Sequence, residues 1–107
     1  MKPTVIIRPR AQADIDECAA FIATGSVEAA HRFLTNAERT LKETALFPKS
    51  GSPRVSARKS LAEIYARPIV GFRNYLVFYR ILKGGNIRVV RVLHGARDVA
   101  TMLRLVK

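Results

Sequence analysis

The chain has 107 residues and a formal net charge of +11, and 49% of its residues are hydrophobic. This length fits a single domain over residues 1–107, and the hydrophobic fraction is too high for a disordered chain. One cysteine, Cys18, excludes an internal disulfide framework and a cysteine-based zinc site. No apolar run, including residues 75–79, is long enough to span a membrane, and the N-terminus lacks a signal-peptide core. We therefore expect a cytoplasmic protein with no membrane contact.

The charge is concentrated in the C-terminal half. Residues 1–48 hold six basic and six acidic side chains, whereas residues 49–107 hold 13 basic and two acidic ones. Like charges gathered in one region raise the local potential and favour an oppositely charged partner. A solvated basic surface that keeps the protein soluble is the alternative interpretation. We expect an acidic or polyanionic partner for the C-terminal half.

The N-terminal half predicts a strand followed by two helices. Residues 4–8 are rich in β-branched side chains and predict an opening strand. Apolar residues then recur with a helical period from Ala11, and Gly25 lies where the C-terminal cap is expected. Ser26 is the expected N-cap of a second helix, which Pro48 should end. Two helices joined by so short a turn form an antiparallel hairpin.

The C-terminal half predicts three consecutive strands. Pro68 places the end of the first strand at an edge or in a bend. The second is apolar on both faces except at Arg80, which is typical of a central strand. Glycine-containing turns on either side of it favour an antiparallel meander. The predicted elements are a loop over 49–54, strands over 61–69, 75–82 and 87–93, turns over 71–74 and 83–86, and a short helix or tail over 99–105 after Asp98.

Together these elements predict an α+β fold. An N-terminal strand and a helical hairpin precede the three-stranded antiparallel meander, and a short C-terminal helix or tail follows it. The first strand must join an edge of the same sheet. The helical hairpin should cover one face of that sheet with its apolar stripe.

Two C-terminal segments are distinctive. Residues 74–80 read NYLVFYR and residues 91–98 read RVLHGARD. With ADID at residues 13–16 and FPKSG at residues 47–51, they make most of the chain resemble the RelE/ParE superfamily of bacterial toxins. The first segment is similar to the aromatic central strand of that superfamily, and the second is similar to the last strand of ParE-type toxins.

The resemblance implies a RelE/ParE-like fold and a small, basic, cytoplasmic toxin that needs no cofactor. It also implies a hetero-oligomer with a cognate acidic antitoxin, ParD-like and partly disordered. ParE-type members inhibit DNA gyrase by binding, and the gyrase–DNA complex would offer a nucleic-acid contact as well. The residues expected to contact the target or the antitoxin are Arg73, Arg80, Arg91 and Arg97.

The alternative within the superfamily is a RelE-like endoribonuclease that cuts messenger RNA on the ribosome. Cleavage of RNA without a metal needs a base, an acid and cations for the phosphate. Arg91 could hold a phosphate, and His94 is the only histidine in the basic half. No tyrosine or further histidine follows His94, so the residues favour a binding toxin over an enzyme. A nucleic-acid-binding module without toxicity is a second alternative, and no metal site is predicted.

Several chemically capable side chains have plainer interpretations. His94 would have a structural role at the end of a strand. Cys18 lies on the apolar stripe of the first helix and is expected in the core. Tyr75 and Tyr79 alternate along one strand and are expected to pack, whereas Tyr65 is the tyrosine expected to be exposed.

Overall fold

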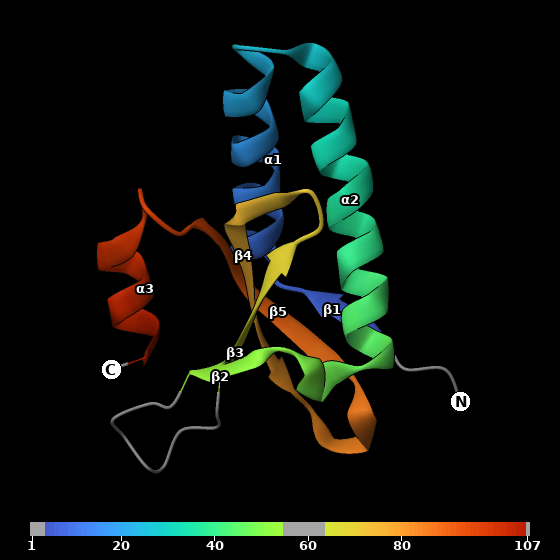
Figure 1. Ribbon diagram of the computed structural model, residues 1–107. Coiled ribbons are helices and arrows are strands. Elements are labelled where there is room, and N and C mark those ends of the chain that lie inside the picture. The colour runs from blue at the N-terminus through green and yellow to red at the C-terminus, as the bar shows by residue number, and fades with distance from the viewer. Residues whose placement is uncertain (1–3, 55–63, 107) are drawn as a thin grey trace.

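The computed structural model describes residues 4–54 and 64–106, which form three helices and a five-stranded mixed sheet (Figure 1). The predicted α+β fold is therefore present. The elements are β1 (Val5–Ile7), α1 (Pro9–Ala23), α2 (Val27–Leu46), the 3₁₀ turn η1 (Pro48–Ser50), β2 (Ser52–Arg54), β3 (Ile64–Ile69), β4 (Phe72–Ile81), the 3₁₀ turn η2 (Lys83–Gly85), β5 (Ile87–His94) and α3 (Val99–Val106).

The predicted meander is only part of the sheet. β3 pairs with β4 and β4 pairs with β5, both antiparallel, as the meander predicts. The sheet has two further strands, and its strand order is β1-β5-β4-β3-β2. β1 joins the edge beside β5 and runs parallel to it. The predicted loop over residues 49–54 is wrong in its second half, because Ser52–Arg54 pairs antiparallel with β3 as the other edge strand. Pairing with β3 imposes extended structure on three residues whose composition is typical of a turn.

The start of β4 is the largest difference between the predicted and the observed strand boundaries. The turn predicted over residues 71–74 is shorter, because β4 already begins at Phe72. Only Gly71 has the positive φ, +76°, that the reversal requires. The register between β3 and β4 shifts next to Pro68, which agrees with the predicted bend. Residues 61–63 of the first predicted strand lie outside the described ranges.

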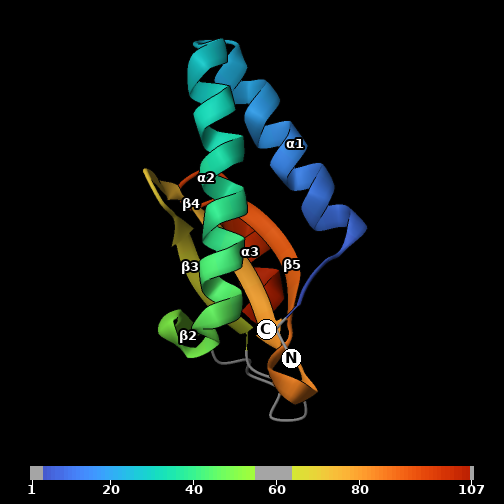
Figure 2. The ribbon, with the colours of Figure 1, turned by 90° about the vertical axis from the view of Figure 1, so that its right-hand side faces the viewer.

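The sheet has an apolar cluster on each face. The larger one packs beneath the α1–α2 hairpin and includes Phe33, Val77 and Tyr79. The smaller one contains Phe78 and Leu93 and packs against α3. Figure 2 shows α2 and α3 on opposite faces of the sheet. The C-terminal segment is therefore a helix that covers the second face. Within the described ranges no helix is long and apolar enough to cross a membrane.

α2 begins and ends where the sequence predicts. α1 differs at both ends: it begins at Pro9, because proline fits the first helical position, and its C-cap is Thr24 and not Gly25, which lacks a positive φ. The hydroxyl of Ser26 accepts a hydrogen bond from the N–H of Ala29 at 3.0 Å, as an N-cap does. α2 ends at Leu46, two residues before the proline that was expected to stop it.

Cys18 is 3% exposed, which confirms its place in the core, and burial raises the pKa of its thiol to about 11.

Tyr79 joins the centre of the sheet to the segment after α2. Its side chain is fully buried, its ring stacks on Tyr65 with centroids 5.7 Å apart, and its hydroxyl donates to the carbonyl of Pro48 at 2.6 Å. A Cβ at Gly51 would contact this hydroxyl and would lie 3.1 Å from the carbonyl of Ala66. The FPKSG segment is therefore held against the sheet by one tyrosine and needs its glycine. The half-buried position of Tyr65 differs from the predicted exposure.

Replacing Tyr79 with phenylalanine should change how stability depends on alkaline pH. Burial raises the pKa of Tyr79 above its ordinary value, so above about pH 10 the unfolded chain loses this proton more readily and stability falls as pH rises. Tyr79→Phe removes the ionisable hydroxyl, and with it this dependence of stability on pH. It also leaves the Pro48 carbonyl without its hydrogen-bond donor. We expect a loss of about 1–2 kcal/mol at neutral pH and a shallower alkaline decline in urea unfolding curves. Parallel declines in the two proteins would contradict this role for Tyr79.

Candidate functional site

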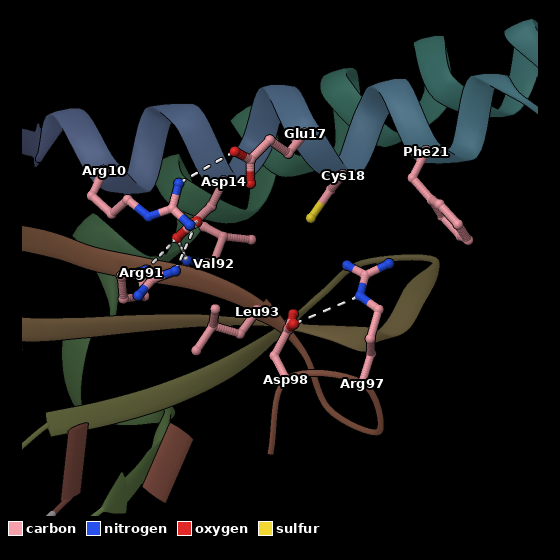
Figure 3. Close-up of a pocket in the computed structure, with 10 residues that line it drawn as sticks. All are labelled: Arg10, Asp14, Glu17, Cys18, Phe21, Arg91, Val92, Leu93, Arg97 and Asp98. Atoms are coloured by element: carbon pink, nitrogen blue, oxygen red, sulfur yellow. Dashed lines mark hydrogen bonds and ion pairs between the residues drawn. The ribbon is translucent and has the colours of Figure 1, made fainter. Parts of the chain in front are cut away.

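A buried ion pair joins α1 to β5, and we call Asp14, Arg91 and Val92 the α1–β5 clasp. The Asp14 side chain is 3% exposed. Arg91 Nε donates to Asp14 Oδ2 at 2.7 Å, and Arg91 Nη2 donates to Asp14 Oδ1 at 3.1 Å. The backbone N–H of Val92 donates to Asp14 Oδ2 at 3.0 Å (Figure 3). One carboxylate therefore accepts three hydrogen bonds from two consecutive residues of the strand.

The clasp exists because β1 is shorter than β5. β1 pairs with β5 only from Ile87 to Val89. The N–H of Arg8 still donates to the carbonyl of Val89 at 3.1 Å, and the chain then leaves the sheet to begin α1. Asp14, on the second turn of that helix, reaches the next part of the strand edge and accepts the N–H of Val92. A helix side chain thus completes the edge where the neighbouring strand has ended.

The clasp neutralises one of the four arginines that were expected to contact a partner. The hydrogen bonds to Asp14 raise the pKa of Arg91 above its ordinary value, so its guanidinium stays charged. One edge of the Arg91 guanidinium is occupied by its two hydrogen bonds to Asp14, and the Arg91 side chain is only 19% exposed. Arg91 in this structure holds the fold together, whatever it contacts in a complex.

A pocket of about 290 Å³ lies between α1 and the segment after β5. Arg97 closes its far side, with its guanidinium 5.1 Å from the centre of the Phe21 ring and its Nε 3.6 Å from Asp98. Arg10 at the near side lies 3.3 Å from Glu17. The pocket has balanced charges rather than a net positive one. Its lining residues are Arg10, Asp14, Glu17, Cys18, Phe21, Arg91, Val92, Leu93, Arg97 and Asp98 (Figure 3).

His94 organises the turn that leads to α3. Its Nδ1 accepts the backbone N–H groups of Ala96 at 3.2 Å and Arg97 at 3.1 Å. Its own N–H donates to the carboxylate of Asp98 at 2.8 Å. The ring packs edge-to-face on Tyr75, with centroids 4.9 Å apart. Because a nitrogen that accepts N–H bonds carries no proton, the neutral ring is protonated at Nε2. This geometry supports the structural interpretation of His94.

The four predicted arginines do not form one site. Arg91 and Arg97 line the pocket beside α1. Arg73 is exposed near the start of β4, whereas Arg80 is half-buried near the end of the same strand. Arg80 is paired in register with Arg88 of β5, a residue that the sequence interpretation did not single out. The predicted contacts therefore lie at three separate places on the molecule.

Three of the basic side chains on the strands and the turn after β5 pair with acids. Residues 64–97 contain seven basic side chains and no acidic one. Arg67 pairs with Glu43 of α2 at 3.2 Å, and Arg91 and Arg97 pair with Asp14 and Asp98 as described. The other four cations of this stretch are Arg73, Arg80, Lys83 and Arg88.

Asp14 is the residue that sequence reasoning missed. From its place near the start of the first predicted helix, only a favourable interaction with the helix dipole is expected of it. Its spacing from Ala11, Ile15 and Cys18 places it on the apolar stripe, and an acid on such a stripe is a signal for a buried partner. No group of three or more metal-binding side chains occurs in residues 4–54 and 64–106.

Comparison with known proteins identifies one family. The model of the ParE toxin of the type II toxin-antitoxin system, parDE, matches residues 5–99, from β1 to the first residue of α3. The match spans the α1–β5 clasp, the sheet and the turn at His94. No curated protein matches the chain.

Proposed function

Because the chain belongs to the ParE toxin family of type II toxin–antitoxin systems, we propose that it inhibits DNA gyrase by binding and that an acidic, ParD-like antitoxin neutralises it. The observation that carries this proposal is the state of the two residues on which an RNA-cleaving site would depend. Arg91 is held by Asp14, and Nδ1 of His94 is used by the turn. Both have the contacts of structural residues.

A ribonuclease site needs proton-transfer groups that reach the substrate. Among the described residues, the tyrosine beside His94 is Tyr75, which is 7% exposed and whose pKa burial raises. A buried phenol with a raised pKa is a poor proton donor near neutral pH. These properties favour a toxin that binds its target over one that cleaves RNA.

The antitoxin is expected on the helical hairpin and at the edges of the sheet. A groove of about 290 Å³ lies between α1, α2 and the end of β1, and it is lined by apolar side chains that include Ile15 and Leu41. Leu34, also in this groove, is 42% exposed. An amphipathic segment of a partner can bury such a groove, and acidic side chains on it would offset part of the basic charge. The resting form would then be a cytoplasmic hetero-oligomer.

Purified protein, free of antitoxin, should stabilise the cleavage complex of gyrase and should leave messenger RNA on translating ribosomes intact. His94→Asn is the variant that separates the two modes of action. An asparagine oxygen can accept the N–H groups two and three residues ahead, as Nδ1 of His94 does, but it cannot transfer a proton near neutral pH. We expect His94→Asn to inhibit gyrase within about twofold of the natural protein.

His94→Ala is the matched control, because it removes the acceptor of the turn as well as the imidazole. It should be less stable than His94→Asn by about 1 kcal/mol. Cleavage of messenger RNA by the natural protein, with a loss of about 10²- to 10⁴-fold in His94→Asn, would instead assign His94 to general acid–base catalysis. That result would overturn the gyrase proposal in favour of the ribonuclease.

A further inference from the structure

Two arginines face each other at the end of the β4–β5 hairpin. Arg80 and Arg88 are register partners, and Lys83 is exposed in the turn η2 that joins the two strands. We call Arg80, Lys83 and Arg88 the hairpin-end cluster. Partners in an antiparallel pair project to the same face with their Cβ atoms about 5 Å apart. Three cations are therefore gathered at this end of the hairpin.

The cluster lies on the face of the sheet away from the helical hairpin. Tyr79 and Ile81 on β4, and Ile87 and Val89 on β5, all pack in the apolar cluster beneath α1 and α2. Because side chains alternate along a strand, Arg80 and Arg88 project to the opposite face. That face is the one covered by α3 (Figure 2).

Most acids of the described ranges lie on the helical hairpin. Six of the seven acidic side chains in the described ranges belong to α1 and α2, and the seventh is Asp98. They neutralise Arg67, Arg91 and Arg97. α3 carries no acidic residue and adds the exposed Arg104 to the opposite face. None of the described acids therefore lies on β3, β4, β5 or α3.

The chemistry of the cluster fits phosphate. Guanidinium groups bind phosphate oxygens through two parallel hydrogen bonds, and a lysine adds a point charge. Gly84 and Gly85 carry no side chains and have open space around them, so a polyanion can lie against the turn. Protein partners rely on apolar anchors. The large exposed apolar side chain in register with the cluster is Ile6, the partner of Arg88 on β1. A single isoleucine offers little apolar area for such an anchor.

We propose that the hairpin-end cluster binds the phosphate backbone of a nucleic acid. The proposal deepens the proposed function, because it gives the nucleic-acid contact of the toxin a place on the sheet. Its test needs neither gyrase nor antitoxin. Failure of gyrase inhibition and failure of this site are therefore separate results.

The test compares two pairs of substitutions that remove the same charge. Arg88→Gln with Lys83→Gln removes two cations from the cluster, whereas Arg32→Gln with Lys42→Gln removes two exposed cations from α2. Binding of a short labelled DNA duplex is measured by fluorescence anisotropy between about 50 and 200 mM salt. We expect the cluster variant to bind about tenfold more weakly or worse, with a slope of log affinity against log salt that is smaller by about 2. The α2 variant should keep the slope of the natural protein.

Equal losses in the two variants would show that only net charge matters and would overturn the proposal. So would the absence of DNA binding by the natural protein, or binding of poly-glutamate as tight as that of DNA. A single-stranded RNA with the same number of phosphates serves as a second probe. Tighter binding of the RNA or of the duplex identifies the source of the phosphates, and a loss confined to the cluster variant supports the site with either. Lys83→Gln alone, in the exposed turn, should lower the slope by about 1 and replaces the double variant if that variant does not fold.

Discussion

Replacing Asp14 with alanine should lower the free energy of unfolding by about 3–5 kcal/mol, because the substitution leaves a buried guanidinium without its partner. The Arg91 side chain is 19% exposed and cannot regain full hydration without moving. The N–H of Val92 also loses its acceptor. Domains of this size are stable by about 5–15 kcal/mol in total, so Asp14→Ala should be near the limit of folding. Urea unfolding followed by circular dichroism measures the difference.

Asp16 provides the matched control, because it lies two residues further along the same helix and is exposed. Its carboxylate accepts a hydrogen bond only from Gln12, at 3.1 Å, among the described residues. Asp16→Ala should therefore cost less than about 0.5 kcal/mol. Removing both charged partners with Asp14→Leu and Arg91→Met should cost less than Asp14→Ala alone, because no unpaired charge is then buried. A loss below about 1 kcal/mol in Asp14→Ala would contradict the importance of the clasp.

The elements that could be predicted are those whose pattern lies within one element. The apolar stripes of α1 and α2, the cap at Ser26 and the stop at Pro48 all depend on residues close in sequence. The antiparallel pairing of β3, β4 and β5 follows from short turns between strands. β2 could not be predicted, because its three residues become a strand only through pairing with β3.

The candidate site was harder to predict, because its partners are distant in sequence. Arg91 and Asp14 are separated by 77 positions. Seen in the sequence, Arg91 is one cation in a basic half, and nothing local distinguishes it from Arg88. Only the packing of α1 along the edge of β5 shows that the first is neutralised while the second faces another arginine.

The structure shows which of the basic side chains in the C-terminal half pair with acids of the N-terminal half. In the sequence, the excess in the C-terminal half predicts an acidic or polyanionic partner for that half. In the structure, the acids of the charge-balanced N-terminal half reach across to the strands at Arg67 and Arg91. Three other cations, Arg80, Lys83 and Arg88, lie together at the end of the β4–β5 hairpin. Mutagenesis of the target surface should therefore begin with Lys83 and Arg88, and not with the two arginines beside α1.

Phe33 is expected to be a highly sensitive position of α2. Its side chain is fully buried in α2 and packs edge-to-face on Phe72, with centroids 5.3 Å apart, and on Tyr75, with centroids 5.1 Å apart. Phe33→Ala removes both ring contacts and leaves a cavity between α2 and β4. We expect a loss of about 3–5 kcal/mol in the free energy of unfolding. Phe33→Leu, which keeps most of the volume, should cost about 1–1.5 kcal/mol.

The same substitution tests whether the hairpin supports the turn at His94. Tyr75 lies between the two, because it contacts the ring of Phe33 on one side and the ring of His94 on the other. If Phe33 positions Tyr75, then Phe33→Leu should alter the near-ultraviolet circular dichroism of the tyrosines and shift the His94 ring signals in NMR spectra, with the helix content unchanged. Val27→Ala is the control, because Val27 is 63% exposed on α2 and should leave the His94 signals in place. Unchanged His94 signals in Phe33→Leu would show that the turn is held by Asp98 and its own backbone alone.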